Sequence, residues 1–494
     1  GGVHRTERPS MTVSRQYIGG SWVPGRGSVI DVVNPASLDV VGAITNATLD
    51  EIELALKAAR KAFPAWSAEP PVKRACLLKK AGRLFRERAD GIARLLTAEQ
   101  GKPLNEALGE IQKLAKTFEF YGEEATRVHG EIIPNDGMDY QSLVVREPVG
   151  VVAAISPWNY PAELIGWKVA AGLAAGCTMV VKPPELTPLS PLEIARCVHD
   201  AGVPAGVLNM VTGEGASVGQ ALVESPLVDK IAFTGSAEVG LRIQKSCNDI
   251  KMLSLELGGN CPMIVTETAD LESAVIGAAR RSFRNMGQIC IAINRIYVAE
   301  PVYERFVGKL AAAADALVID NGLDNPAADL GAMASAEPLE KTKDHLADAL
   351  SRGARLVAGG SPPEGDRFRK GYFFRPTVLA DCTHEMKVMT EETFGPLVGV
   401  APFRSLAHAA DLANDTPFGL AAYVFTKHMD EMRYLTKRLD YGNVAVNNVD
   451  AGIINAPYGG RKQSGVGYEH GREGLLEYLN LKHIRLRFEE VQGA

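Results

Sequence analysis

The stretch TMVVKPPELTPLSPLEIARCVHDAGVPAGVLNMVTG, residues 178–213, places one helix between two strands. Apolar, β-branched runs at 178–182 and 207–212 predict the strands, and the segment near 191–201 predicts the helix. Short apolar strands separated by a helix are typical of βαβ units, in which the strands run parallel. This stretch therefore predicts an α/β fold built on a parallel sheet.

The same alternation continues on both sides. It runs to about residue 256 and restarts after Gly258 and Gly259, so we expect a domain boundary near these glycines and two parallel-sheet α/β domains. Thr48 and Glu51 have capping-box spacing at the start of the first predicted helix. The other predicted helices cover 72–100, 104–128, 216–224, 236–247, 270–285 and 302–317, after the first at 48–62. An apolar, β-branched region covers 143–155 and ends in a predicted strand at 151–155, and the other predicted strands cover 230–234, 252–256, 262–266 and 295–298. The tail 482–488, KHIRLRF, alternates like an edge strand, which pairs either with a neighbouring subunit or within its own chain.

The composition of the 494 residues excludes several classes of protein. Asp and Glu number 59 against 53 Lys and Arg, a net charge of −6, which argues against nucleic-acid or membrane-surface partners. Hydrophobic residues make up 46%, as in a globular protein with a large core. No apolar run reaches the ~18 residues that span a bilayer, and residues 1–10 lack the apolar segment of a secretory signal.

The cysteines argue for a reducing compartment. There are seven, at positions 76, 177, 197, 247, 261, 290 and 382, widely spaced and without a CxxC motif. The nine histidines form no HExxH motif. This pattern is neither a disulfide framework nor a zinc site, so we expect a cytoplasmic protein without a metal.

Three polar residues stand where predicted helices or strands end. Cys290 closes GQIC after a helix, Glu256 ends an apolar strand before two glycines, and Asn159 lies in SPWNYP after a strand. Taken singly, each has an ordinary explanation as a buried thiol, a capping carboxylate or a packed turn. The glycines near residues 213–219 have GxGxxxG spacing, which departs from the dinucleotide fingerprint GxGxxG.

Six motifs nevertheless occur in one order: SPWNYP at 156–161, KPPE at 182–185, FTGS at 233–236, ELGG at 256–259, GQIC at 287–290 and EETFGP at 391–396. In this order and separation the chain resembles the NAD(P)-dependent aldehyde dehydrogenase superfamily, from about Tyr17 to about Phe488. The resemblance implies an aldehyde-dehydrogenase-like α/β fold and a homodimer or homotetramer. Its parts would be a Rossmann-like NAD-binding domain (11–130 and 150–258), a catalytic domain (259–456) and a β oligomerisation arm (131–149 and 480–494).

The resemblance also implies oxidation of an aldehyde to its acid with NAD, NADP being the second candidate cofactor. Cys290 would add to the carbonyl carbon, and the Asn159 side chain with the Cys290 backbone N–H would stabilise the oxyanion. Glu256 would activate the water that hydrolyses the thioester, and we expect its desolvated carboxyl to have a raised pKa. Lys168 and Glu469 match positions linked in the family to proton handling.

Cofactor-binding residues follow from the same resemblance. Lys182 and Glu185 would address the adenosine ribose hydroxyls. Because a carboxylate accepts from a 2′-hydroxyl but repels a 2′-phosphate, Glu185 predicts a preference for NAD. The resemblance assigns further residues to the adenine, the pyrophosphate, the nicotinamide ribose and the approach between them. These residues are Ile155, Ser156, Trp158, Gly215, Gly235, Ser236, Leu257, Glu392 and Phe394.

The aldehyde itself is the open question. Parts of the chain, such as EETFGP and GGRKQSG, resemble the succinate-semialdehyde dehydrogenase branch, which uses arginines to hold the substrate carboxylate. Arg284 matches one of these arginines, whereas Trp167 stands at the other. We therefore expect an apolar or aromatic aldehyde, with a semialdehyde as the alternative and Arg284 as the single cationic anchor. The predicted pocket residues are Tyr160, Trp167, Arg284, Ile289, Ile291 and Tyr458.

Three other functions stay open at this point. A CoA-acylating dehydrogenase would differ at the ELGG glutamate, and Glu256 is present. A catalytically silent structural or binding member of the family would have lost part of the site, whereas Cys290, Asn159 and Glu256 are intact. A cysteine hydrolase needs a histidine beside the thiol, and we expect none from the matched motifs.

Overall fold

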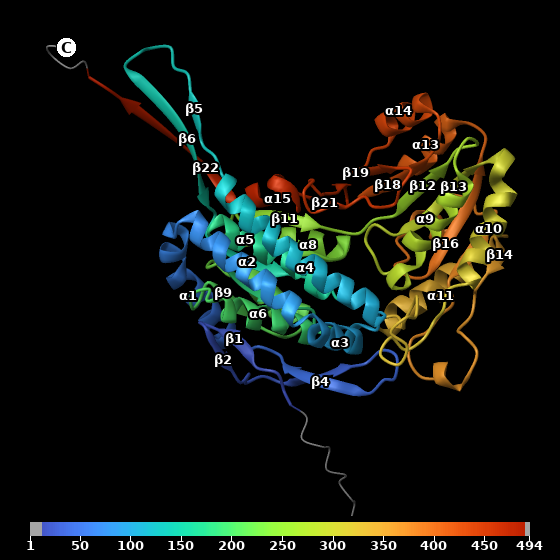
Figure 1. The fold of residues 1–494 in the computed structure, drawn as a ribbon, viewed down its shortest axis with the longest axis horizontal. Helices are drawn as coiled ribbons and strands as arrows, with labels where there is room; N and C mark the ends of the chain where they lie inside the picture. Colours follow the sequence, from blue (N-terminus) through green and yellow to red (C-terminus); the bar gives the residue numbers. More distant parts are fainter. Residues whose placement is uncertain (1–11, 490–494) are drawn as a thin grey trace, which may run out of the picture.

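Two large sheets organise residues 12–489, the part of the chain that the computed structural model describes (Figure 1). The expectations for residues 1–10 and for 490–494 of the arm lie outside the described residues. Among residues 12–489, no helix is both long and apolar enough to cross a membrane. A third, smaller sheet projects from the body as an arm.

The first sheet has eight strands in the order β2-β1-β9-β8-β7-β10-β11-β21. Its strands are β1 (Gln16–Ile18), β2 (Ser21–Val23), β7 (Val151–Ile155), β8 (Thr178–Lys182), β9 (Leu208–Met210), β10 (Lys230–Thr234), β11 (Met252–Glu256) and β21 (Gly465–Val466). The five strands from β9 to β11 are parallel, so their carboxyl ends meet at one edge. Ligands of open α/β sheets collect at that edge.

Helices cover both faces of this sheet. Val152 and Ala154 of β7 pack into a core formed with α2 to α6, whereas Val151 and Ala153 pack into a second core with α1 and α7. This alternation follows from the period of two along a strand. The helices are α1 (Leu49–Ala68), α2 (Pro71–Glu87), α3 (Ala89–Gln100), α4 (Leu104–Glu124), α5 (Pro161–Ala175), α6 (Leu189–Ala201), α7 (Gln220–Glu224) and α8 (Ala237–Ser246).

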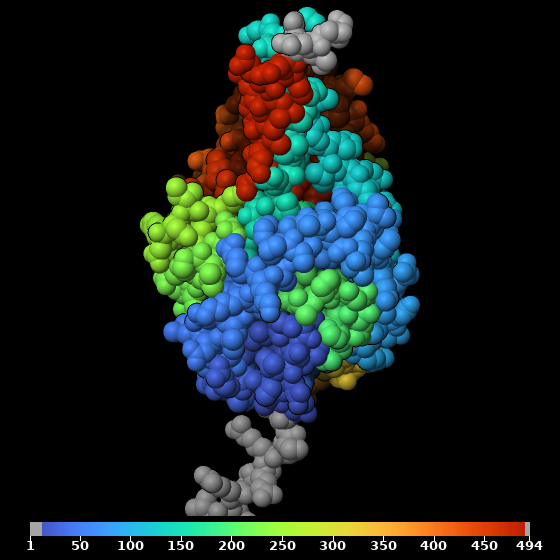
Figure 2. All heavy atoms as spheres, turned by 90° about the vertical axis from the view of Figure 1, so that its left-hand side faces the viewer, coloured from blue at the N-terminus to red at the C-terminus, as the bar shows by residue number. Residues whose placement is uncertain are grey.

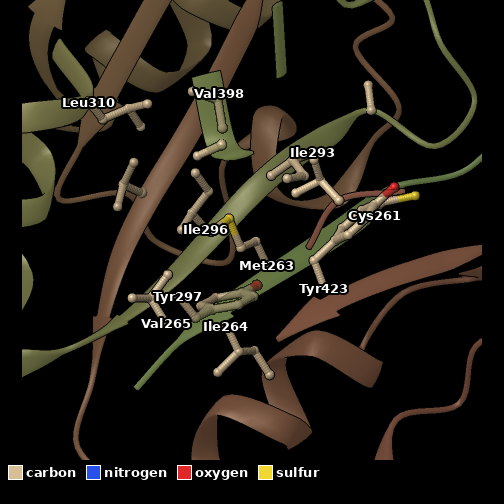
Figure 3. Close-up of a cluster of buried hydrophobic side chains, with 14 of the residues drawn as sticks. Cys261, Met263, Ile264, Val265, Ile293, Ile296, Tyr297, Leu310, Val398 and Tyr423 are labelled. Atoms are coloured by element: carbon tan, nitrogen blue, oxygen red, sulfur yellow. The ribbon is translucent and has the colours of Figure 1, made fainter. Parts of the chain in front are cut away.

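The second sheet has seven strands in the order β14-β15-β16-β13-β12-β18-β19. Its strands are β12 (Cys261–Val265), β13 (Ile293–Ala299), β14 (Arg355–Ala358), β15 (Thr377–Ala380), β16 (Leu397–Phe403), β18 (Ala421–Phe425) and β19 (Asn443–Val446). The chain passes from the first sheet to the second between β11 and β12, through Gly258 and Gly259. Figure 3 shows the core around β12 and β13, where Met263, Ile264 and Ile296 are fully buried.

Helices surround this second sheet, and three further strands form the arm. The helices are α9 (Leu271–Phe283), α10 (Tyr303–Asp315), α11 (Ala336–Ser351), α12 (Lys387–Thr390), α13 (Leu406–Asn414) and α14 (Met429–Arg438). The arm consists of β5 (Glu131–Ile133), β6 (Tyr140–Pro148) and β22 (Leu479–Arg487), in the order β22-β6-β5 (Figure 2). The predicted edge strand of the tail therefore pairs with β6 of its own chain. Smaller elements are β3 (Val29–Val33), β4 (Val40–Thr45), β17 (Phe418–Gly419), β20 (Arg461–Lys462) and α15 (Gly471–Leu476).

The structure confirms the predicted capping motif and corrects the bounds of several predicted helices. The capping box is present, with the Glu51 carboxylate accepting from the Thr48 N–H at 2.8 Å. The single helix predicted over 72–100 is wrong, because non-helical Arg88 divides it into α2 and α3. Within the apolar region 143–155, the predicted strand 151–155 is confirmed as β7, and the residues before Gly150, which has φ +128°, belong to β6 of another sheet. The segment 216–224 begins with a π-helical turn, Gly215–Gly219, rather than an α-helix.

Candidate active site

Cys290 lies in a tight connection between α9 and β13. Asn285 and Met286 have φ of +50° and +59°, and Gly287 continues with +70°. A Cβ at Gly287 would lie 2.0 Å from the Gly395 carbonyl oxygen, so this turn requires glycine. Non-glycine residues in the left-handed region are uncommon and concentrate at functional sites. Here the turn brings the half-buried Cys290 to the meeting point of two cavities.

The two cavities have volumes of about 220 and 340 Å³, and Asn159, Leu164 and Cys290 line both. The first cavity borders the carboxyl edge of the first sheet through Thr234 and Leu257. The second lies between α5 and α9. A molecule in either cavity would therefore reach the same sulfur atom.

Three hydrogen bonds fix Asn159 beside this meeting point of the two cavities. Its side-chain Nδ2 donates to the Gln288 carbonyl oxygen at 3.0 Å, and its own backbone carbonyl accepts from Lys102 Nζ at 2.8 Å and Asn285 Nδ2 at 3.0 Å. The Asn159 side chain is buried, and its Oδ1 has no hydrogen-bond partner within the described structure. An amide NH₂ carries two hydrogens, so one remains for a further acceptor.

Glu256 is buried at the end of β11, and both of its carboxylate oxygens are unpartnered among the described residues. Burial first, and then the charge of Glu469, raise the pKa of Glu256 well above its ordinary value, while Lys168 opposes them. The upward shift expected from the sequence is therefore present. Because a buried carboxylate without partners is costly, this side chain is suited to taking up a proton.

Lys168 and Glu469 meet although 301 positions separate them along the chain. Lys168 projects from α5, its Nζ pairs with the Glu469 carboxylate, and it also donates to Thr234 Oγ1 at 2.6 Å. Both residues are buried. The structure thus brings both predicted residues to the neighbourhood of Glu256, on whose pKa they act.

The predicted cofactor residues fall into two groups. The first cavity is lined by six of them: Trp158, Gly235, Ser236, Leu257, Glu392 and Phe394. Glu392 accepts a hydrogen bond from the Gly259 N–H at 3.0 Å, and burial raises its pKa to about 6. The Ser236 hydroxyl accepts from the Val239 N–H and so caps α8.

The second group lies farther along the same sheet edge. Lys182 and Ile155 are register partners at the ends of β8 and β7. Lys182 Nζ lies 3.0 Å from the Glu185 carboxylate, which also accepts from the Gly215 N–H at 3.2 Å. The Ser156 hydroxyl is buried without a partner in the described structure, so it is free to bind a ligand.

The second cavity contains all six predicted pocket residues and six charged or polar ones that the sequence analysis missed: Lys113, Glu163, Arg280, Arg281, Asp450 and His470. Tyr160, Trp167, Arg284, Ile289, Ile291 and Tyr458 line it as predicted. The expectation of Arg284 as the single cation is wrong, because Lys113, Arg280 and Arg281 line the cavity as well. Helical spacing from Arg284 could have indicated Arg280 and Arg281, which share α9. Lys113 comes from α4, and no local signal pointed to it.

His470 is another of the missed residues. It lies just before α15 and lines the cavity that holds the Cys290 thiol. Its Nδ1 lies 3.0 Å from the Ile453 carbonyl, which can only accept, so Nδ1 carries the proton. Burial lowers the pKa of His470 to about 3. The ring is therefore neutral, and the partner of Cys290 Sγ is instead the Tyr458 hydroxyl at 3.0 Å.

Comparison with known proteins agrees with this geometry. Residues 22–484 match the model of the aldehyde dehydrogenase family. The chain belongs to the aldehyde dehydrogenase family. It is an oxidoreductase that acts on the aldehyde group of small molecules, and within residues 12–489 no cluster of three or more His, Cys, Asp or Glu side chains could hold a metal ion.

Individual relatives sharpen the comparison. The chain is 45% identical over 472 residues to a succinate-semialdehyde dehydrogenase [NADP(+)] of Escherichia coli, covering 94% of this chain and 96% of the relative. It is 44% identical over 480 residues to a 3-sulfolactaldehyde dehydrogenase of Pseudomonas putida, covering 97% and 98%. A crystal structure of betaine aldehyde dehydrogenase from Staphylococcus aureus in complex with NAD+ is 35% identical, with a TM-score of 0.93 and coverage of 97% and 96%. This aldehyde dehydrogenase therefore has the family fold and uses NAD or NADP.

Proposed function

We propose that this enzyme oxidises an aldehyde that carries an anionic group at its far end to the corresponding acid. The observation that carries the proposal is the set of basic side chains in the cavity that Cys290 borders. Arg284 Nε bonds Glu106 at 3.0 Å, Arg281 lies 3.3 Å from Asp450, and Lys113 lies 3.8 Å from Glu163. Arg280 also pairs with Asp450, so the four cations exceed their three acidic partners by one charge.

Arg284 is the best placed anchor among them. Its side chain is largely buried, and its guanidinium carries five N–H donors of which Glu106 takes one in the described structure. A planar guanidinium binds carboxylate or sulfonate oxygens in pairs, and such charge-assisted bonds are strong when water is excluded. The names of two relatives, a succinate-semialdehyde and a 3-sulfolactaldehyde dehydrogenase, describe aldehydes with an anionic far end.

In the proposed mechanism, Cys290 Sγ attacks the carbonyl carbon, and the free Asn159 Nδ2 hydrogen with the Cys290 N–H holds the resulting oxyanion. A bound nicotinamide would supply the acceptor for the hydride that leaves this carbon. Glu256 then takes a proton from the water that hydrolyses the Cys290 thioester. Lys168 and Glu469 carry that proton onward from Glu256.

The residues around the first cavity fit a dinucleotide. The Glu392 carboxylate supplies a polar group there, and Trp158 and Phe394 pack edge to face at 5.5 Å. The unpartnered Ser156 hydroxyl supplies another polar group farther along the sheet edge. Glu392 would bind one ribose, Gly235 and Ser236 the pyrophosphate, and Lys182 with Glu185 the other ribose. Glu185 supports a preference for NAD over NADP.

We also propose the division into cofactor domain, catalytic domain and oligomerisation arm. The separate sheets support it, with one addition: β21 lies in 457–479, which the predicted ranges leave out, and it pairs with β11 of the first sheet. Exposed Ile132, Leu481 and Leu486 on the arm support a homodimer or homotetramer. The seven cysteines are free thiols, which supports a cytoplasmic location.

The kinetic comparison of succinate semialdehyde with butanal, its neutral analogue of equal chain length, tests the substrate class. We expect a higher kcat/KM for succinate semialdehyde, and Arg284→Met should lower that preference by about 30-fold, or about 2 kcal/mol, typical of a bond to a charged group. Arg242→Met, which changes an exposed arginine paired with Glu238, is the matched control. A preference of the unmodified enzyme for butanal or benzaldehyde by about tenfold would favour the apolar pocket instead.

A further inference from the structure

We propose that Tyr458 is a catalytic residue whose hydroxyl donates a hydrogen bond to the Cys290 thiolate and so stabilises the ionised sulfur that attacks the aldehyde. The inference rests on the proposed role of Cys290 as the nucleophile. The two atoms, Tyr458 Oη and Cys290 Sγ, lie 3.0 Å apart. Within residues 12–489, no other side chain hydrogen-bonds to this sulfur.

The Tyr458 ring is fixed before any substrate binds. Its backbone N–H donates to the Glu469 carbonyl at 2.7 Å and its carbonyl accepts from the Glu469 N–H at 2.8 Å. The ring packs against Trp167 and His470, with centroids 5.5 and 5.3 Å away, and the residue is 2% exposed. A donor held in place in this way stabilises charge without the cost of reorganisation.

The direction of the hydrogen bond follows from which group keeps its proton. Burial raises the pKa of Tyr458 well above its ordinary value, so the phenol stays protonated. A thiolate can only accept, and a hydrogen bond to a charged acceptor is about twice as strong as one between neutral groups. When Cys290 ionises, the contact therefore becomes a charge-assisted bond from Tyr458 Oη to Sγ.

The thiol needs such a donor because its surroundings disfavour the anion. Burial raises the pKa of Cys290 to about 12, and the Tyr458 hydrogen bond acts in the opposite direction. Among the charged groups nearby, Glu392 and Glu256 raise this pKa and Arg281 lowers it. His470, the titratable ring on the other side of Tyr458, is neutral and contributes no charge.

The pH dependence of alkylation of Cys290 by iodoacetamide, followed on the Cys290 peptide by mass spectrometry, tests the proposal. Tyr458→Phe removes only the hydroxyl and should move the profile up by about one pH unit, a tenfold loss of thiolate near neutral pH. Because a more basic thiolate is intrinsically more nucleophilic, the observed rate at neutral pH should fall by only about threefold. Tyr423→Phe is the matched control, since that hydroxyl donates to the Ile291 carbonyl instead.

Fluorotyrosine incorporated at position 458 gives a second, non-disruptive variant. It keeps the ring and the hydroxyl but is a stronger donor, so the profile should move to lower pH. An unchanged profile in both variants would overturn the inference, and it would leave the role of Cys290 untouched. Failure of the proposed function would look different. Cys290→Ser would then retain dehydrogenase activity, while Tyr458→Phe would still shift the pH profile of Cys290 alkylation.

Discussion

Lys102 and Glu110 form a fully buried ion pair directly beneath Asn159, with 2.6 Å between Lys102 Nζ and Glu110 Oε2. Lys102 also donates to the Asn159 carbonyl, and Glu110 accepts from the N–H groups of Ala162 and Glu163 at the start of α5. The pair therefore ties the loop that carries Asn159 to the helix that carries Lys168. It links α4, which packs in the core of the first sheet, to the proposed oxyanion site.

Removal of one partner should be costly for folding. We expect Lys102→Met to lower the free energy of unfolding by about 3–5 kcal/mol, because it leaves the Glu110 charge buried without its cation. Lys309→Met, which breaks an exposed pair with Glu272, should cost only about 0–1 kcal/mol. Urea denaturation of both variants measures the difference. Equal losses in the two variants would contradict this account of the buried pair.

Glu185 should set the cofactor preference. Although burial alone would raise its pKa, Lys182 beside it lowers the pKa, so the side chain is ionised at neutral pH. A 2′-phosphate would meet this negative charge, and kcat/KM should be higher with NAD than with NADP. Glu185→Gln should raise kcat/KM for NADP relative to NAD by about tenfold. A higher kcat/KM with NADP in the unmodified enzyme would show that this assignment is wrong.

Glu256 should give the hydrolysis step a distinct pH dependence. A general base works in its deprotonated form, and burial raises the pKa of Glu256 well above its ordinary value. The rate of thioester hydrolysis should therefore be low in mild acid and rise as the pH passes through this raised pKa. Hydrolysis of a preformed acyl-enzyme at several pH values measures it. A rate already constant from pH 5 upward would exclude Glu256 as the base.

Cys290→Ser should abolish dehydrogenase activity while binding of NAD and folding stay intact. A serine hydroxyl is far less ionised than a thiol near neutral pH, so no covalent adduct forms. Activity is measured as NADH absorbance, and cofactor binding by fluorescence titration. Retention of more than about one hundredth of the activity would argue against Cys290 as the nucleophile.

The five parallel strands of the first sheet, together with β12 and β13 of the second, could be predicted because apolar, β-branched runs carry a local signal. The strands at 178–182, 230–234 and 252–256 have the predicted bounds. The break at Arg88 has no such signal, because neither Gly nor Pro stands at or beside this position between α2 and α3. The strand at 151–155 also has its predicted bounds, and the preceding strand at 140–148 belongs to the arm.

Site residues that lie in recognisable motifs could be predicted from the sequence, whereas contacts between segments far apart in the chain could not. Cys290, Asn159 and Glu256 lie in recognisable motifs. The contact of Cys290 with Tyr458 joins residues 168 positions apart, and Lys113 reaches the cavity from α4. Such contacts depend on how α5, α9 and the segment that carries Tyr458 pack together, and the order of residues along the chain does not specify this packing.

The acyl-enzyme formed by Glu256→Gln tests the central claim most directly. This variant, mixed rapidly with NAD and succinate semialdehyde, should release about one NADH per active site in a burst and then stall, because hydride transfer is intact and hydrolysis is slowed. Mass spectrometry of the quenched protein should find the succinyl group on the Cys290 peptide. Absence of a burst together with an unmodified Cys290, or an acyl group on another residue, would contradict the account.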